Sequence, residues 1–466
     1  MATICGTDSA HTLEEIEATA TGVAAELARR GLRRGDRVLL LAGNSVHYVT
    51  ALLGLVHLGA SIVLVDSQES AAATRDVLLR ARVKACLVDD APAAEKVAPV
   101  PSIALPELLA AARPGGGPVD AGAWAALPDG LLMSTSGSTG RPKVVVKTGA
   151  SFLANLRRTA DALSYTPSDV LAPLLPFSHQ YGLSLVFAAW LVRCSLVVAP
   201  HRRLDHALAL AGLRNATVFD AAPSTYRSLL NIIRMRPVLR AALDRARMLC
   251  VGAAPLNDLL VARYRAELGK PLLDGYGSTE LNNVSFAVPG NPVATGAPLT
   301  GVDVQVVGDD DAPVEAGEVG EILVRSPDLM AGHLDEEGEL VPAPPGWFRT
   351  NDFGLYDAGG NLHVLGRKRA VHRMGYTLYP EIIERRIAEA GCCAKLVALP
   401  DERDGSRLVA FVEDDSGHDA AYWRARMAGI LSAYELPNRV VVVDSFPLNR
   451  NGKPDSHQLT EMALTA

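Results

Sequence analysis

Amphipathic segments and short apolar runs alternate along the first part of the chain, and this alternation constrains the fold more than any other feature. The pattern predicts helices over Leu13–Arg30, which stops near Gly31, and over Val49–Leu58. Each helix precedes a short apolar run that is typical of a strand, Arg37–Ala42 and Ser61–Asp66. Strands that alternate with helices form largely parallel sheets covered by helices, so we predict an α/β fold.

The length of the chain and the pattern of its later part predict two domains. A chain of 466 residues is too long for one ordinary compact core. A second α/β stretch runs from Ser151 to about Glu280, and short strands between glycine turns follow from Thr295 to Leu365. We therefore expect a large N-terminal domain over residues 1–367, made of stacked sheets and helices with a β-rich subdomain. A small, mobile α+β domain is expected over residues 368–466.

The composition argues against several classes of protein. Hydrophobic residues make up 48% and charged residues 21%, and a net charge of −7 gives no basic excess for nucleic acid. The six cysteines form no CxxC pair, which argues against a zinc site. The N-terminus lacks the pattern of a signal peptide, and His57 and Arg193 interrupt the longest apolar stretches. We therefore expect a cytoplasmic protein with no membrane or nucleic-acid partner.

The strongest chemical signal is a loop rich in glycine, serine and threonine at residues 133–143, MSTSGSTGRPK. Apolar triplets at Leu131–Met133 and Val144–Val146 flank it, so the segment is expected to form strand, tight loop and strand. The N–H groups and hydroxyls of such a loop can surround phosphate oxygens, and Arg141 and Lys143 add positive charge. A flexible linker is the alternative, but linkers rarely lie between apolar strands. The loop lacks the Walker A spacing, which argues against a P-loop kinase or ATPase.

This loop resembles the phosphate loop of the adenylate-forming superfamily, which contains acyl- and aryl-CoA synthetases, the adenylation domains of peptide synthetases, and beetle luciferases. Three more motifs follow in the order of that superfamily: DGYGSTE at 274–280, Thr350–Asp352 with Gly366 and Arg367, and PLNRNGKPD at 447–455. The resemblance covers nearly the whole chain. It is closest in style to stand-alone aryl or acyl acid ligases.

The resemblance implies a binding site for ATP and Mg²⁺. Tyr276 is expected to stack on adenine, Thr279 to contact the α-phosphate, and Asp352 to hold the ribose hydroxyls. Glu280 is expected to ligate Mg²⁺, which prefers hard oxygen ligands. The full set of implied nucleotide-binding residues is Thr135, Ser136, Gly137, Ser138, Thr139, Gly140, Lys143, Gly252, Ala253, Ala254, Asp274, Gly275, Tyr276, Gly277, Ser278, Asp352 and Arg367.

The chemistry implied by the resemblance needs positive charge at the reacting centre. A carboxylate that attacks the α-phosphate brings two anions together and expels pyrophosphate. Lys453, on a glycine-containing loop near the end of the chain, is the expected catalytic lysine. Thr279, Glu280 and His179 complete the expected catalytic set. Taken singly, Lys453 would be an ordinary surface lysine and Glu280 a solvated acid, and only the accompanying motifs reverse that interpretation.

The segment 176–183, PFSHQYGL, resembles one wall of the carboxylic-acid pocket in this superfamily. Its His179-Gln180-Tyr181 is similar to the His-Asn-Tyr of salicylate- and dihydroxybenzoate-activating enzymes, or to the His-x-x-Gly of CoA ligases, and Gln180 is expected to hydrogen-bond a ring substituent. A structural histidine at a helix start is the alternative for His179. Domains that activate α-amino acids usually carry an aspartate in this segment, and its absence disfavours amino acids. The expected pocket residues are His179, Gln180, Tyr181, Gly252 and Gly275, with small residues leaving room for a flat ring or a chain.

The predicted domain junction departs from the superfamily pattern. The segment 366–375, GRKRAVHRMG, is about one residue short, and Arg369 or Ala370 stands where a hinge aspartate is usual. Leu378–Pro380 with Glu384 nevertheless resembles the corresponding residues of CoA ligases. Gly375 is expected on the face of the small domain that meets the acyl-adenylate during thiol transfer, where glycine leaves room for a thin pantetheine arm.

The sequence therefore predicts ATP-dependent activation of a small carboxylic acid, aryl or acyl rather than an α-amino acid, to an acyl-adenylate with release of pyrophosphate. The acyl group is then expected to pass to a thiol, either coenzyme A or the phosphopantetheine of a carrier protein. The alternatives are an amide ligase with an amine acceptor, a luciferase-like oxygenase, and a non-catalytic nucleotide-binding regulator on the same fold. The presence of Lys453 and Glu280 argues against the regulator.

Overall fold

The computed structural model describes residues 1–135, 143–254, 256, 258–308, 310–367, 371–373, 376–389, 391–401, 405–414, 416–449 and 452–465. Thr135 and Lys143 therefore represent the two ends of the predicted phosphate loop. Ser136, Gly137, Ser138, Thr139 and Gly140 lie outside the described residues, and so does Gly375.

A largely parallel sheet of nine described strands forms the part of the molecule next to the site. Its edge strands pair antiparallel, whereas β10, β9, β11, β12 and β13 run parallel. In spatial order the strands are β15 (Ala297–Pro298), β14 (Asn282–Phe286), β13 (Leu273–Ser278), β12 (Met248–Val251), β11 (Val218–Ala221), β9 (Val170–Pro173), β10 (Ser195–Val197), β1 (Thr3–Cys5) and β2 (Ala10–Thr12).

A second sheet, with eight described strands, carries the two ends of the phosphate loop. Five neighbouring strands, from the centre of this sheet to one of its edges, pair in parallel, and the other three described strands pair antiparallel. Its spatial order is β19 (Leu340–Pro342), β18 (Gly332–Leu334), β8 (Lys143–Lys147), β7 (Leu131–Thr135), β4 (Ser61–Leu64), β3 (Arg37–Leu41), β5 (Ala85–Val88) and β6 (Ser102–Ala104). The antiparallel pair β7 and β8 confirms the strand, loop and strand predicted on either side of the phosphate loop.

Helices cover both sheets, and their ends follow local sequence signals. The first helix begins at a capping box in which Thr12 and Glu15 bond each other's backbone amides, and the second ends at Gly59 in the left-handed conformation. Ser45 caps the second helix at Val46, three residues before the predicted start. The helices of this part are α1 (Leu13–Arg29), α2 (Val46–Leu58), α3 (Ala71–Arg80), α4 (Ala91–Val97), α5 (Leu105–Ala111), α6 (Gly122–Ala125), α7 (Gly149–Ala162), α8 (Gln180–Val192), α9 (Leu204–Leu213), α10 (Pro223–Met235), α11 (Arg240–Arg245) and α12 (Asp258–Leu268), with a 3₁₀ turn η1 at Pro237–Leu239.

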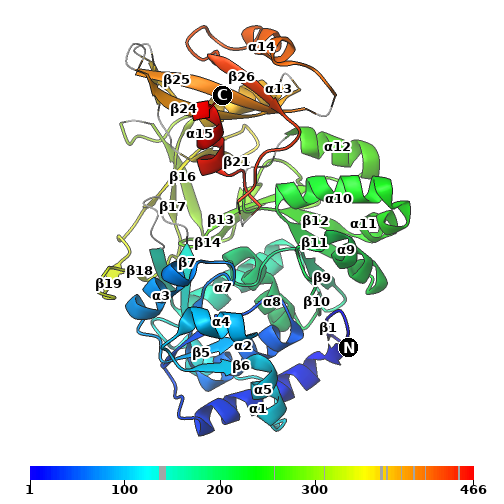
Figure 1. The fold of residues 1–466 in the computed structure, drawn as a ribbon, viewed down its shortest axis with the longest axis vertical. Coiled ribbons are helices and arrows are strands. Elements are labelled where there is room, and N and C mark those ends of the chain that lie inside the picture. Colours follow the sequence, from blue (N-terminus) through cyan, green and yellow to red (C-terminus); the bar gives the residue numbers. More distant parts are fainter. Residues whose placement is uncertain are drawn as a thin grey trace.

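The layers of the N-terminal part follow from how the buried side chains cluster. One large core joins α1, α2, α7 and α8 to the facing sides of both sheets, so these helices lie between the sheets. A second core packs α9 to α12 on the outer face of the nine-stranded sheet, and a third packs α3 on the outer face of the other sheet. Figure 1 shows α9 to α12 gathered on one flank and α1, α2 and α5 at the base. The predicted α/β architecture of stacked sheets and helices is confirmed.

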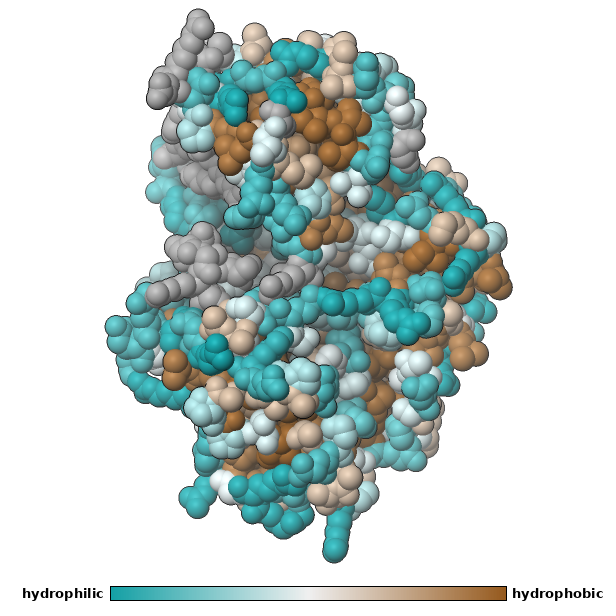
Figure 2. Space-filling model, in the orientation of Figure 1, coloured by the Kyte–Doolittle hydropathy of each residue, from teal (hydrophilic) through white to brown (hydrophobic). Residues whose placement is uncertain are grey.

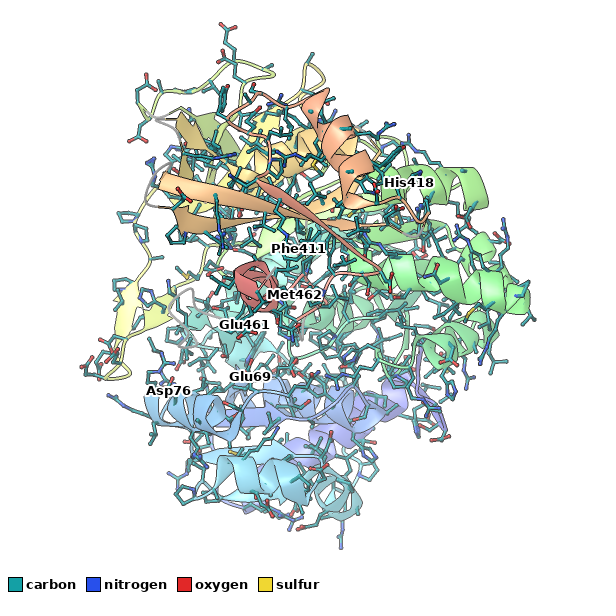
Figure 3. The ribbon with its side chains drawn as sticks, turned by 45° about the horizontal axis from the view of Figure 1, so that its top comes forward. Glu69, Asp76, Phe411, His418, Glu461 and Met462 are labelled. Atoms are coloured by element: carbon teal, nitrogen blue, oxygen red, sulfur yellow. The ribbon has the colours of Figure 1, made fainter. Side chains whose placement is uncertain are left out.

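A β-rich segment and a small α+β unit complete the chain. The small unit lies at the top of Figure 1, above the β-rich segment, and hydrophobic residues gather on part of its visible surface in Figure 2. Phe411 and Met462 belong to one of its two small cores and are labelled in Figure 3. The β-rich sheet consists of β16 (Asp303–Val307), β17 (Gly320–Arg325), β20 (Phe348–Tyr356) and β21 (Leu362–Arg367). The small unit holds β22 (Val371–Arg373), β23 (Tyr376–Leu378), α13 (Pro380–Glu389), β24 (Cys393–Asp401), β25 (Gly405–Glu413), α14 (Ala420–Ala428), β26 (Arg439–Val443) and α15 (Ser456–Thr465).

The two long apolar stretches of the sequence form α2 and α8, each followed by a strand. Within the described ranges, none of the helices combines the length and the apolarity that a bilayer crossing requires.

Candidate active site

A cavity of about 520 Å³ lies between the N-terminal part and the small C-terminal unit. Its walls come from segments far apart in the sequence, and several of them belong to the predicted motifs. The motif residues that line it are Ala253, Ala254, Asp274, Gly275, Tyr276, Gly277, Asp352, Gly366, Arg367, Lys453 and Pro454. The structure thus brings the three described motifs together around one cavity.

Three of these side chains form a connected group on one wall of the cavity. The buried hydroxyl of Tyr276 donates to Asp352 Oδ2 over 2.7 Å, and Arg367 Nε lies 3.2 Å from Asp352 Oδ1. Asp352 and Arg367 are direct cross-strand neighbours in β20 and β21, so the sheet register sets this pair. Burial raises the pKa of Asp352, and Arg367 and Tyr276 oppose that shift. The group joins an aromatic ring, a carboxylate and a guanidinium at the place predicted for adenosine.

The lysine loop of the C-terminal unit reaches this cavity. Its turn is held by two bonds between Asn449 and Lys453, from the Asn449 amide to the Lys453 carbonyl and from the Lys453 amide to Asn449 Oδ1. Lys453 remains exposed to the cleft, yet the surrounding protein shields its ammonium from bulk water and lowers its pKa. Arg367 adds to this effect and Asp352 opposes it. Lys453 therefore lines the same cavity as the group that contains Tyr276, and its catalytic role stays a prediction.

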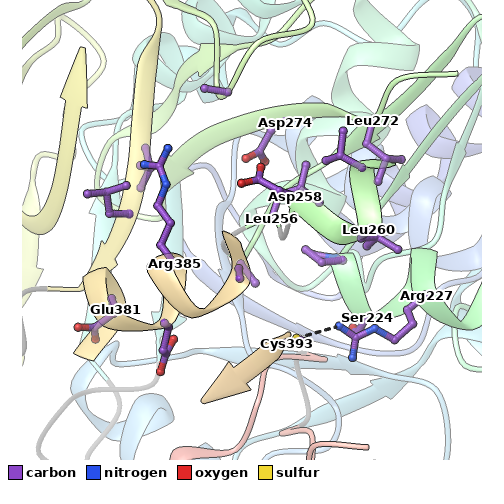
Figure 4. Close-up of a pocket in the computed structure, with 18 of the residues that line it drawn as sticks. Ser224, Arg227, Leu256, Asp258, Leu260, Leu272, Asp274, Glu381, Arg385 and Cys393 are labelled. Atoms are coloured by element: carbon purple, nitrogen blue, oxygen red, sulfur yellow. Dashed lines mark hydrogen bonds between the residues drawn. The ribbon is translucent and has the colours of Figure 1, made fainter. Parts of the chain in front are cut away.

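A second cavity, of about 480 Å³, adjoins the first between α10, α12 and the C-terminal unit. Figure 4 shows Ser224 and Arg227 on one side and Glu381 and Arg385 of α13 on the other. Arg227 forms an ion pair with Glu413 of β25, and its Nη2 donates to Cys393 Sγ over 3.6 Å. These contacts cross from the N-terminal part to the C-terminal unit, so they hold β24 and β25 against α10.

Thr279 and Glu280 lie in the turn between β13 and β14, next to the cavity, and both are partly buried. The Glu280 carbonyl accepts a bond from the Met330 amide, which fixes the backbone of the turn. Among the described residues there is no group of three His, Cys, Asp or Glu side chains placed to hold a metal ion. The assignment of Glu280 as a Mg²⁺ ligand stays a prediction.

His179, at the start of α8, is paired with Asp66 at the end of the β4 segment. Its Nε2 lies 2.9 Å from Asp66 Oδ2. Burial tends to raise the pKa of Asp66, but hydrogen bonds from His179 and from the Gln68 amide outweigh it and lower that pKa to about 2. The carboxylate therefore stays ionised and fixes the imidazole. This contact supplies a structural reason for His179, and its catalytic role stays a prediction.

Gln180 is engaged by other side chains on both sides of its amide. Its Oε1 accepts from Lys147 Nζ over 2.6 Å, and its Nε2 donates to Asn282 Oδ1 and to Ser184 Oγ. Lys147 is fully buried at the end of β8, also donates to Asn282 Oδ1, and lies 5.7 Å from the centre of the Phe152 ring. The expected bond from Gln180 to a ring substituent stays a prediction, because it requires one of these internal bonds to be exchanged.

Tyr181 links α8 to the ends of the strands. A Cβ at Gly252 would lie 3.0 Å from Tyr181 Cε1, so glycine allows the ring to pass close to the backbone. The Tyr181 hydroxyl donates to Asp220 Oδ1 over 2.9 Å. Gly252 directly precedes Ala253 and Ala254, which line the first cavity. The predicted residues Tyr181 and Gly252 are therefore in contact, and they connect the nucleotide cavity to Asp220.

Lys147 and Asp220 were not among the predicted site residues. Each is a charged residue type in a strongly apolar strand, Val144–Lys147 and Val218–Ala221, and this is the one sequence signal that marks them. Which neighbours they meet could not be derived, because those neighbours lie 33 or more positions away along the chain.

Comparison with known proteins agrees with this arrangement. The sequence profile described as "AMP-binding enzyme" matches residues 1–334, and the profile of the AMP-binding enzyme C-terminal domain matches residues 386–453.

Two characterised relatives align along almost their whole length. The 3-[(3aS,4S,7aS)-7a-methyl-1,5-dioxo-octahydro-1H-inden-4-yl]propanoyl:CoA ligase of Mycobacterium tuberculosis (strain ATCC 25618 / H37Rv) is 29% identical over 98% of this chain and 94% of its own length. A feruloyl-CoA synthase of Amycolatopsis sp is 29% identical over 96% of this chain and 92% of its own. The ATP-bound structure of MatB from Rhodopseudomonas palustris superposes with a TM-score of 0.85 at 26% identity, covering 99% of this chain and 95% of that one. The chain therefore belongs to the AMP-binding enzyme family, and it is an AMP-forming acid–thiol ligase.

Proposed function

We propose that this ligase activates an aryl or acyl acid without an α-amino group and passes it to coenzyme A, with adenylation at the cavity bounded by Tyr276, Asp352, Arg367 and Lys453. The observation that carries the proposal is the docking of the Lys453 loop from one unit against the Tyr276–Asp352–Arg367 group of the other. A lysine that faces this group supplies positive charge where an acid and a phosphate meet.

The residues around the cavity fit ATP and Mg²⁺, which the enzyme uses as its family does. Lys453 and Arg367 provide two positive charges in a cavity large enough for a nucleotide. Asp352 is placed to accept from ribose hydroxyls, and Lys143 stands exposed at the end of the phosphate loop. Glu280 would offer Mg²⁺ a carboxylate oxygen, and Mg²⁺ normally completes its shell with water and phosphate oxygens.

The chemical contribution of the protein is mainly orientation and charge. Two anionic reactants must approach each other, so the Lys453 ammonium would bind the charge that grows on the phosphoryl oxygens in the transition state. The Asp66–His179 pair and the network of Lys147, Gln180 and Asn282 would fix the wall that holds the acid. With that wall fixed, the carboxylate is held in line with the phosphate.

The deciding experiment is ATP–pyrophosphate exchange with a panel of hydroxyaryl, aryl, fatty and α-amino acids. We expect exchange with at least one aryl or acyl acid, none with the amino acids, and loss of exchange without Mg²⁺. The accepted acid is then offered coenzyme A, a phosphopantetheinylated carrier protein and a small amine. The products are identified by mass spectrometry, and the coenzyme A thioester should dominate.

Each alternative has its own outcome in these assays. A carrier-bound thioester or an amide as main product contradicts the proposed acceptor. Preference for an α-amino acid contradicts the proposed acid class. Nucleotide binding without exchange for any acid indicates a regulator, and oxygen uptake or light indicates an oxygenase.

A further inference from the structure

Asp220 occupies an unusual position for a carboxyl group. It lies in β11 between Pro173 of β9 and Cys250 of β12, near the end of three parallel strands. Its strand neighbours Phe219 and Ala221 face the outer core with α9 to α12. Asp220 points to the other face of the sheet, the face that α8 covers. Only 1% of it is exposed, and its Oδ1 contacts Tyr181, a residue of the predicted acid-pocket wall.

The hydrogen bonds of Asp220 are incomplete. Oδ1 accepts from the Tyr181 hydroxyl, whereas Oδ2 has no hydrogen-bond partner in the part of the chain that the structure describes. The buried hydroxyl of Tyr165 is likewise without a partner there, and the charge of Asp220 acts on it. Buried polar atoms are normally paired, so such atoms need a reason.

Asp220 is harder to ionise than an ordinary aspartate because it is buried. Burial raises its pKa to about 7, and the bond from Tyr181 opposes this shift only in part. Since Tyr181 donates to Oδ1, the proton of the neutral form belongs on Oδ2, the atom without a partner. That atom can donate when Asp220 is protonated and accept when it is ionised.

Asp220 Oδ2 lies close to residues of the predicted acid-pocket wall. Tyr181 is one of the residues that resemble the acid-pocket wall, and it packs on Gly252, next to the cavity residues Ala253 and Ala254. The other polar group of this wall, Gln180, is already engaged by Lys147, Asn282 and Ser184. Among the described residues, Asp220 Oδ2 therefore retains hydrogen-bonding capacity next to this wall, whereas the Gln180 amide is engaged at both ends.

We propose that Asp220, oriented by Tyr181, determines substrate specificity by hydrogen-bonding a hydroxyl group at the end of the acid remote from its reacting carboxylate. A hydroxyl both donates and accepts, so it satisfies Oδ2 in either protonation state. A second carboxylate would meet the Asp220 carboxyl, which contacts no cationic side chain in the described part of the chain. An ammonium would require a fully desolvated ion pair. The inference rests on the proposed acid-activating function.

The test compares kcat/KM for adenylation between acids that differ by one hydroxyl: 4-hydroxycinnamate with cinnamate, 4-hydroxybenzoate with benzoate, and an ω-hydroxy fatty acid with its parent. We expect the wild-type enzyme to prefer the hydroxylated member of at least one pair. Asp220→Leu should reduce that preference roughly 10- to 100-fold, the range for one buried hydrogen bond. Asp220→Asn, which retains a donor and an acceptor, should keep most of it.

Two further variants separate this role from a structural one. Tyr181→Phe removes the hydroxyl that orients Asp220, so it should raise KM more for the hydroxylated acid than for the unsubstituted acid. Phe219→Leu, on the opposite face of the same strand, should leave the preference unaltered. Should Asp220→Leu fail to fold, Asp220→Ala serves the same comparison.

The outcomes also separate this inference from the proposed function. Pyrophosphate exchange with no acid at all overturns both. Exchange that is normal but shows no preference for hydroxylated acids overturns the inference alone, and so does a preference for dicarboxylates or amines. Thermal denaturation shows whether the Asp220→Leu enzyme is folded. If it is folded and its kcat/KM falls equally for both acids of a pair, the inference is overturned as well.

Discussion

At the scale of single residues, the buried amine of Lys147 joins the acid wall to the turn that follows the DGYGSTE motif. A neutral lysine has two N–H groups, and Lys147 has two acceptors, Gln180 Oε1 and Asn282 Oδ1. Burial lowers its pKa from 10.5 to about 7, although Glu280 and Asp328 act in the opposite direction. The side chain therefore fits its site best without a full charge, which makes the stability of the protein depend on pH.

We predict that the free energy of unfolding rises with pH between about 7 and 10.5, relative to a Lys147→Met variant. In this range the unfolded chain keeps a proton on Lys147 that the folded protein has lost, so the folded state gains as protons become scarce. One such group contributes at most about 1.4 kcal/mol per pH unit. Urea unfolding at several pH values measures the difference. If the free energy of unfolding changed with pH equally in the wild-type protein and the Lys147→Met variant, Lys147 would stay charged in the folded protein.

Lys453 provides the second prediction at this scale. Lys453→Ala should lower pyrophosphate exchange by about 10²–10³-fold, because a positive charge at the transition state is lost. ATP binding, followed by calorimetry, should change much less, since the contact matters most in the transition state. Lys84→Ala removes an exposed lysine that bonds Asp36 and serves as the control. Exchange near the wild-type rate would remove Lys453 from the mechanism.

At the scale of elements, the lysine loop combines an internal turn with a close contact to α10. Gly452 has a positive φ of 70°, a conformation in which other residues are strained. A Cβ at this position would lie 2.8 Å from Ser224 Oγ, at the start of α10. Glycine thus allows the loop to turn and to approach the N-terminal part at the same point.

We predict that Gly452→Ala slows adenylation by roughly 5- to 30-fold, which corresponds to about 1–2 kcal/mol for a left-handed alanine. Replacing Ser224 by alanine as well removes the atom that the new Cβ meets, and should restore part of the rate. The backbone strain remains in that double variant, so recovery should be incomplete. A Gly452→Ala enzyme with unchanged exchange kinetics would mean that the loop does not dock in this way during catalysis.

At the scale of the whole molecule, an ion pair of Arg227 crosses the cleft to the C-terminal unit. The ion pair of Arg227 with Glu413 joins α10 to β25 and keeps Lys453 over the cavity. After adenylation, pyrophosphate must leave and a thiol must enter, which this arrangement does not readily permit. We therefore infer two positions of the C-terminal unit, related by rotation near residues 368–370, with the domain boundary after residue 367.

Arg227→Met should slow adenylation by about two- to fivefold and leave thioester formation from preformed acyl-adenylate unchanged. A partly exposed ion pair contributes about 1 kcal/mol or less, which sets this modest range. Arg227→Lys should retain most of the rate. Rapid-quench measurements of the two half-reactions provide the data, and equal slowing of both would argue against a role in selecting one position.

A substitution at Gly375 tests the second position of the C-terminal unit, the one inferred for thiol transfer. Although it lies outside the described residues, the sequence places it on the face expected to meet the acyl-adenylate. Gly375→Trp should block transfer to the thiol and spare pyrophosphate exchange, because a bulky side chain closes the path of the pantetheine arm. If both steps slow alike, or transfer continues, the rotation is contradicted, and a one-position enzyme that releases its adenylate to an amine becomes the better hypothesis.

The sequence by itself determined the local features of this protein. Capping residues fixed where α1 begins, apolar periodicity marked α2 and β3, and the DGYGSTE and lysine-loop motifs each contribute residues to the wall of one cavity. These features depend on neighbours within a few positions, or on a chemical requirement that a short motif records. For that reason the family and the general reaction could be predicted before any packing was known.

The tertiary structure alone decided which side chains surround the predicted acid-pocket wall. Gln180 was predicted as a free partner for a substituent, but Lys147 from one sheet and Asn282 from the other engage it. Asp220 lies 39 positions from Tyr181, and the sequence around His179 gave no sign that an aspartate would reach this wall. Side chains on a strand face one side or the other, and which residues they meet depends on how sheets and helices pack. The local sequence carries no record of those distant partners.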